Sequence, residues 1–230
     1  NNQTIWPLQW WIIAPAVSTV ASYAKKYAEI TPQISILDLN LYTLDEIQGV
    51  LSEHLANKPD IVGISFTFDV SYRHVKDITK QIKDHDDKTV IVMGGPAATV
   101  SYTEILEQQE HIDAICYAEG ELAMCRLIDS EDPMEELTKH PWVTTKSLAS
   151  IRAPMTQYVD SLDDVIAIDY SLVDIAAYSM KEAFSPFASY RNDVGVRQFF
   201  LVTSRGCPFK CVFCAEPAFH GKAMRYASLD

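Results

Sequence analysis

The sequence predicts an α/β protein built on a doubly wound parallel sheet. Two features of residues 1–130 lead to this prediction: short apolar runs recur along the chain, and a longer segment of helical character separates each run from the next. Most of these runs are apolar throughout rather than alternately apolar and polar, which is typical of parallel strands buried on both faces. The regular order of strand and helix therefore predicts a Rossmann-like domain over residues 1–130.

The predicted strands are short runs rich in β-branched and aromatic residues. They span 8–13, 34–38, 60–66, 89–93 and 113–117. The first, LQWWII, stops before Pro15, because proline breaks a helix interior but suits the first turn of a helix. The fourth, TVIVM, is followed by Gly94-Gly95-Pro96, where the chain is expected to turn.

The predicted helices span 15–29, 45–57, 70–83, 102–109 and 121–128. The buried face of the first is expected to consist of small apolar residues in helical spacing: Val17, Val20, Ala21, Ala24 and Ala28.

Beyond residue 130 the pattern loosens. We expect 131–196 to be a linker that packs on both neighbours, because it keeps many aromatic and aliphatic residues; within it, 142–146 is a candidate strand and 161–164 a helix start. A strand at 197–203 then begins a second domain, 197–230.

Composition excludes several classes of function. The net charge of −12 argues against non-specific nucleic-acid binding, which needs a basic face. No apolar run is long enough to span a bilayer, and no signal peptide is visible. The five cysteines are an odd number and do not form the framework of a disulfide-rich secreted protein, so we expect a cytoplasmic protein. The chain starts without methionine and stops soon after a cysteine-rich loop, so we expect it to be a fragment.

That loop carries the strongest functional signal. Cys207, Cys211 and Cys214 stand at C-x₃-C-x₂-C spacing, directly after an apolar run and the turn-forming pair Arg205-Gly206. Thiolates are soft ligands, so three in one loop suit an iron–sulfur cluster or zinc. Three cysteines would leave one iron of a four-iron cluster free to bind another molecule. The alternatives are a structural zinc site completed by His220, or thiols that serve only as small apolar side chains.

The loop resembles that of radical S-adenosylmethionine enzymes, in which an aromatic residue, here Phe213, precedes the last cysteine. This resemblance implies a [4Fe–4S] cluster on the three cysteines, with S-adenosylmethionine bound at the open iron beside Phe213. Reductive cleavage would yield a 5′-deoxyadenosyl radical, with electrons from a reductant such as flavodoxin or ferredoxin. It also implies that the strand and loop begin a (β/α) barrel that is truncated here, so the fragment alone is expected to be inactive.

Small and polar residues follow the predicted strands of the first domain. In doubly wound folds ligands bind beyond the carboxyl ends of the strands, and these residues lie there: Asp38, Asn40, Ser65, Thr67, Gly94, Gly95 and Pro96. Glycine lets a backbone approach a ligand closely, and hydroxyls supply hydrogen bonds. The structural alternative is that they only form turns and helix caps. No G-x-G-x-x-G occurs, which argues against a nicotinamide site.

The stretches VGISF, VIVMGGPAAT and IDAICYAEGE resemble the cobalamin-binding domain found upstream of many radical S-adenosylmethionine enzymes. The resemblance implies that Ser65, Thr67 and the Gly94-Gly95-Pro96 turn line the pocket for the cobalamin nucleotide tail, with Glu119 and Gly120 nearby. One position departs from the pattern. Domains that supply an axial histidine carry D-x-H-x-x-G, whereas this chain has Asp38-Leu39-Asn40, and an amide is a poor cobalt ligand. Either cobalamin binds without a protein nitrogen on its lower face, or the domain is only a scaffold.

The resemblance implies methylation of an unactivated carbon of a small-molecule or natural-product substrate. Two alternatives stay open. The first is a radical enzyme with other chemistry, such as ring formation or rearrangement, that uses the first domain as scaffold. The second is a non-catalytic module that binds cobalamin or zinc.

The remaining cysteines, Cys116 and Cys125, fall on a predicted strand and helix and are expected to lie in the core.

Overall fold

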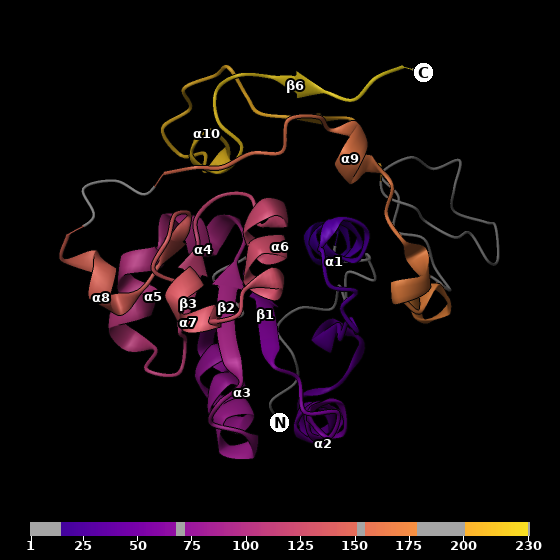
Figure 1. The fold of residues 1–230 in the computed structure, drawn as a ribbon, viewed down its shortest axis with the longest axis vertical. Coiled ribbons are helices and arrows are strands. Elements are labelled where there is room, and N and C mark those ends of the chain that lie inside the picture. Colours follow the sequence, from indigo (N-terminus) through magenta and orange to yellow (C-terminus); the bar gives the residue numbers. More distant parts are fainter. Residues whose placement is uncertain (1–14, 68–71, 151–154, 179–200, 230) are drawn as a thin grey trace, which may run out of the picture.

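The computed structural model describes residues 15–67, 72–150, 155–178 and 201–229. They form a four-stranded sheet covered by helices, with a C-terminal segment lying across one end of it (Figure 1). The predicted strand at 8–13 lies outside the described residues, as do residues 197–200 of the predicted strand at 197–203. None of the described helices is long and apolar enough to cross a membrane.

The sheet has the order β1-β2-β3-β4. Strands β1 (Ile61–Ser65), β2 (Val90–Gly94) and β3 (Ala114–Cys116) are parallel, as predicted, whereas β4 (Trp142–Val143) runs antiparallel to β3. The sheet is therefore mixed rather than purely parallel. An antiparallel strand at the edge of a parallel sheet is common, and here it covers the open edge of β3 with two buried apolar side chains. Part of the segment predicted as a linker thus completes the first sheet.

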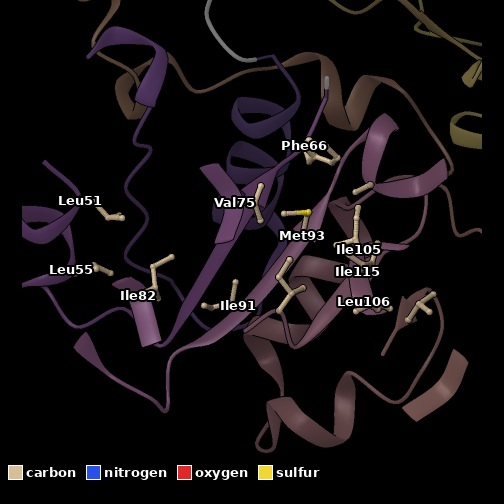
Figure 2. Packing of buried hydrophobic residues seen from close by; sticks show 13 residues of the cluster. Leu51, Leu55, Phe66, Val75, Ile82, Ile91, Met93, Ile105, Leu106 and Ile115 are labelled. Carbon is tan, nitrogen blue, oxygen red and sulfur yellow. The ribbon is translucent and has the colours of Figure 1, made fainter. Parts of the chain in front are cut away.

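Both faces of β2 are buried, which explains why this strand is apolar at every position but its last. Ile91 and Met93 point to one face, where they join a core formed with helices α2 (Leu44–Leu55), α3 (Tyr72–His85) and α5 (Tyr102–Gln108) (Figure 2). Val90 and Val92 point to the other face and pack with residues of α6 (Glu121–Asp129) and with Trp142. Successive side chains of a strand point to opposite faces, so such a strand has no polar side.

Helix α1 (Pro15–Tyr27) packs against α6 and against α9 (Asp163–Ile166), and it begins at Pro15 as predicted. Two short helices follow α6, namely α7 (Pro133–Glu136) and, after β4, α8 (Thr145–Leu148). The described residues also form three 3₁₀ turns: Leu39–Leu41, Tyr170–Leu172 and Ile175–Tyr178.

Two local predictions differ from the structure. Residues 34–38 are not part of a sheet, because they form no ladder with any described strand; Leu37 instead packs on the edge of the core. A helix that the sequence analysis missed, α4 (Pro96–Val100), begins at Pro96 directly after the glycine pair. Proline at the first helical position is favourable, since its missing N–H has no partner there in any case.

The C-terminal segment forms a small unit of its own. Strand β5 (Ser204–Arg205) pairs antiparallel with β6 (Arg225–Tyr226), and helix α10 (Glu216–Phe219) lies between them in the chain. Of the predicted strand at 197–203, the described residues 201–203 form no strand; β5 begins at Ser204, where β6 offers a hydrogen-bonded partner. Helix α10 contacts α4, so this unit lies over the end of the sheet at which β2 leads into α4 (Figure 1).

Candidate functional site

The carboxyl ends of β1 and β2 meet at a tight turn. Ser65 and Gly94 are ladder partners, and the Phe66 N–H donates to the Gly94 carbonyl at 2.8 Å. Gly95 has φ of +108°, and a Cβ there would stand 2.7 Å from the Phe66 carbonyl oxygen. Only glycine fits such a position. The close approach of the β2–α4 turn to the Phe66 backbone thus explains why residue 95 is glycine. Ser65 and Thr67, on either side of Phe66, are exposed.

Asp38 and Asn40 form a local turn. The Asp38 carboxylate accepts hydrogen bonds from the Asn40 backbone N–H at 2.9 Å and from the Asn40 side-chain amide at 2.8 Å. This arrangement caps the 3₁₀ turn Leu39–Leu41, which is the structural role that short polar side chains often have. Asn40 is exposed, and its amide is used to hold the turn.

The cysteine loop is held by its ends. The Cys207 N–H donates to the Gly221 carbonyl at 3.1 Å, and the Cys214 N–H donates to the Cys211 carbonyl at 3.2 Å. Gly206, with φ of +96°, lets the loop start so close to Ala223 that a Cβ would stand 2.1 Å from its carbonyl oxygen. The turn predicted at Arg205-Gly206 is confirmed, and the close approach to Ala223 explains its glycine.

The three thiols are free and accessible. Cys207 is half-buried, whereas Cys211, Cys214 and the neighbouring Phe213 are exposed. Among the described residues, no three His, Cys, Asp or Glu side chains are arranged to hold a metal ion. The chemistry of this donor set, three thiols within one short loop, suits an iron–sulfur cluster. Binding would have to draw the sulfurs together, as is usual when metal binding is coupled to folding.

A buried network of charges lies between this loop and the end of β3. Glu119 and Glu121, just beyond β3, are 3% and 2% exposed, and Arg205, two residues before Cys207, is 7% exposed. Arg205 Nη2 donates to Glu121 Oε1 at 2.6 Å. Its Nη1 lies 3.1 Å from Glu119 Oε2, an ion pair without the alignment of a hydrogen bond.

Glu119 also contacts the far side of the loop. Its Oε1 lies 2.7 Å from His220 Nδ1 and accepts from Arg225 Nη2, and its Oε2 lies 3.2 Å from Arg225 Nη1. Arg225 in turn stacks on the Tyr158 ring, with 4.4 Å between the guanidinium carbon and the ring centroid. This network could not be predicted from local sequence patterns, because its partners are 84 to 106 residues apart in the chain. Arg225 is partly buried by its ion pair with the buried Glu119.

The charges of the network shift one another's pKa values. Burial by itself raises the pKa of the Glu119 carboxyl, but hydrogen bonds from His220 and Arg225 and the nearby guanidinium charges lower it below its usual value. Burial lowers the pKa of Arg205, whereas the Glu121 and Glu119 carboxylates raise it, and the net direction is upward. Both groups are therefore charged at neutral pH.

Cys116 and Cys125 lie in the core, as predicted. Burial raises the pKa of Cys116 to about 12 and that of Cys125 to about 11. A thiol reacts or binds metal as its thiolate, so these two are inert at neutral pH. The candidate ligands are therefore confined to the C-terminal loop.

Comparison with known proteins gives independent information. A family model described as the B12 binding domain matches residues 13–128. An uncharacterized methyltransferase of Pyrococcus horikoshii is 31% identical over 173 residues, which are 75% of this chain and 35% of that protein. The anaerobic magnesium-protoporphyrin IX monomethyl ester cyclase of Rubrivivax gelatinosus is 24% identical over 221 residues, or 93% of this chain and 36% of the cyclase.

A third relative is the cobalamin-dependent radical SAM methyltransferase TokK of Streptomyces tokunonensis. It is 23% identical over 158 residues, which make up 68% of this chain and 22% of TokK. The chain thus spans about a third or less of the length of these relatives. The family model covers strands β1 to β3 and helices α1 to α6, but not β4, whereas the alignment with the cyclase extends over most of the chain.

Proposed function

We propose, because this chain belongs to the B12-binding domain family, that it binds cobalamin at the carboxyl end of its sheet and presents there the cluster loop of a radical S-adenosylmethionine enzyme. One observation carries this proposal. The loop with three free thiols follows a B12-binding domain in the chain and folds back onto the end of its sheet, through the contact of α10 with α4. In doubly wound folds that end is where ligands bind.

Each part of the proposed site has residues suited to it. Cys207, Cys211 and Cys214 would hold a [4Fe–4S] cluster, and the exposed Phe213 would lie beside S-adenosylmethionine. The nucleotide tail of cobalamin would bind along the Gly94-Gly95-Pro96 turn. There the exposed hydroxyls of Ser65 and Thr67 make no hydrogen bond to another described residue.

Asn40 would not ligate cobalt, because an amide is a poor cobalt ligand and the Asn40 side-chain N–H already donates to the Asp38 carboxylate. Cobalamin would therefore bind without a protein nitrogen on its lower face. When bound, the cluster and S-adenosylmethionine supply a 5′-deoxyadenosyl radical and cobalamin supplies a methyl group, while the protein binds and orients them. The reaction proposed for the whole enzyme is methylation of an unactivated carbon.

A second candidate is ring formation. The alignment with the magnesium-protoporphyrin cyclase, which covers 93% of the chain, favours it. In that case the radical chemistry would be shared, and methyl transfer would be absent.

Cobalamin binding can be tested on the 230-residue chain. We expect hydroxocobalamin to bind with a change in its visible spectrum, and Thr67→Trp to weaken binding at least tenfold, since the indole would fill the space beside the turn. Thr145→Trp is the matched control, because Thr145 is exposed on α8 and no hydrogen bond of its hydroxyl is seen among the described residues. Equal loss of binding in both variants, or no binding by the parent chain, would contradict the proposal.

A further inference from the structure

We propose that Glu119 is a positioning residue that fixes the cysteine loop over the end of the sheet by binding both ends of the loop at once. This proposal rests on the proposed function only for the purpose that it assigns to the loop. The contacts of Glu119 with Arg205, His220 and Arg225, here called the joint, are a property of the chain itself. Arg205 precedes Cys207 by two residues, and His220 and Arg225 follow Cys214. The Glu119 carboxylate contacts all three.

The backbone around Glu119 is itself held in place. Ala118 has φ of +68°, an unfavourable conformation for a residue with a side chain. It is buried, and its N–H donates to the hydroxyl of the buried Thr99 on α4 at 3.1 Å. Such a conformation persists only where the surroundings determine it. The turn therefore aims the Glu119 side chain at the loop, and α4, which the loop unit also contacts, anchors that turn.

The chemistry of the joint favours positioning over simple stabilisation. Removing charges from water is costly, and a buried ion pair is often no more stabilising than apolar residues of the same size. The advantage of a buried ion pair is its directionality. The carboxylate oxygens and the guanidinium N–H groups pair in a defined geometry, so one arrangement of the two chain segments is favoured. Here two carboxylates face two guanidinium groups and one imidazole across two segments of the chain. A slip of the loop would leave at least one buried charge without its partner.

The other side of the joint adds a steric limit. A Cβ at Gly221 would meet the Tyr158 hydroxyl at 3.2 Å, and Gly221 has φ of +79°. Tyr158 also stacks on Arg225. The segment that returns from the loop is therefore limited both by the Tyr158 ring and by the Glu119 carboxylate.

The proposal can be tested by hydrogen exchange on the metal-free chain, comparing the parent with Glu119→Gln. This change keeps the shape of the side chain and removes its charge. We expect amides of the joint, such as Cys207 N–H and Ala227 N–H, to exchange at least tenfold faster. Amides of β2, in the middle of the sheet, should change less than twofold, because a positioning role leaves the sheet intact. The control Glu110→Gln alters a carboxylate that is 77% exposed and should change neither.

A double-mutant cycle then separates a direct contact from a general loss of stability. Arg225→Gln alone should also speed exchange of the loop amides. The double variant Glu119→Gln/Arg225→Gln should cost less than the product of the two single effects, because no charge of this pair is left unpaired. If Glu119→Gln does not fold, the comparison of Arg225→Lys, which keeps the charge, with Arg225→Gln takes its place. The lysine variant should then retain most of the protection.

Unchanged exchange at 204–226 in Glu119→Gln, an equal increase in β2, or fully multiplicative effects in the double variant would overturn the proposal. So would binding of one zinc ion per chain that His220→Gln abolishes, since His220 would then serve a metal rather than the joint. The exchange result is independent of the proposed function. If the parent chain binds no iron, that function fails while the joint stands; if iron binds and exchange is unchanged, only the joint fails.

Discussion

At the scale of single residues, glycine and buried charge decide how the end of the sheet is built. Gly95 lets the β2–α4 turn approach the Phe66 backbone, and Glu119 collects positive groups from both ends of the cysteine loop. By their resemblance to a cobalamin-binding domain, both positions are predicted to lie near cobalamin. The structure adds a conformational reason for the glycine and an electrostatic role for the glutamate, and the proposed contacts with cobalamin stay predictions.

The backbone conformation of Gly95 can be tested directly. Gly95→Ala forces a Cβ within 2.7 Å of the Phe66 carbonyl oxygen and requires a positive φ from alanine. We expect it to lower the free energy of unfolding by about 2 kcal/mol or more, from backbone strain plus the steric clash. Urea unfolding followed by far-ultraviolet circular dichroism would measure the loss.

Gly49→Ala is the matched control. Gly49 lies inside α2, and nothing is within 4 Å of the Cβ it would gain. Replacing a glycine inside a helix by alanine should raise the free energy of unfolding by about 0.5–1 kcal/mol. A loss of stability at Gly49, or none at Gly95, would show that the conformations assigned to these two positions are wrong.

At the scale of helices and strands, the sequence was informative wherever the apolar period was clear. The strands at 61–65, 90–94 and 114–116 and helices α1, α2, α3, α5 and α6 confirm their predictions to within a few residues. The candidate strand at 142–146 is confirmed as the two-residue β4, which exists only through its pairing with β3. Helix α4 was missed, because five residues leave no room for a helical period. Strand β5, also of two residues, depends on its pairing with β6.

Strand β4 is the element whose importance the sequence underestimated. Trp142 is 2% exposed and packs with the side of the core that faces α6. Trp142→Ala should therefore lower the free energy of unfolding by about 3–5 kcal/mol, as expected for a large buried aromatic residue. Thermal or urea unfolding of the whole chain would measure it.

Trp142→Phe provides the comparison. The indole N–H is buried without a partner among the described residues, so its removal relieves a desolvation cost and offsets part of the lost contact. This variant should lose much less stability than the alanine variant. If both variants unfold like the parent chain, β4 contributes little to the first sheet.

At the scale of the whole molecule, the chain joins a B12-binding domain to a cysteine loop that folds back onto it. The sequence predicted both parts, since each has a local pattern. It could not predict their joint, because Glu119 meets Arg205 and Arg225 across roughly half the chain, and nothing in the local sequence of any of them specifies a buried partner. Long-range ion pairs of this kind become visible only in three dimensions.

Metal content decides between the functions considered. The chain would be purified without oxygen, supplied with iron, sulfide and cobalamin, and then freed of excess reagent before iron, sulfide, zinc and cobalt are measured per chain. We predict about four iron and four sulfide, as a single cubane cluster requires, together with about one cobalt. A triple Cys207→Ala/Cys211→Ala/Cys214→Ala variant should lose the iron and keep the cobalt. Zinc at about one per chain without iron, or iron that survives loss of the three cysteines, would contradict a radical S-adenosylmethionine cluster in this loop.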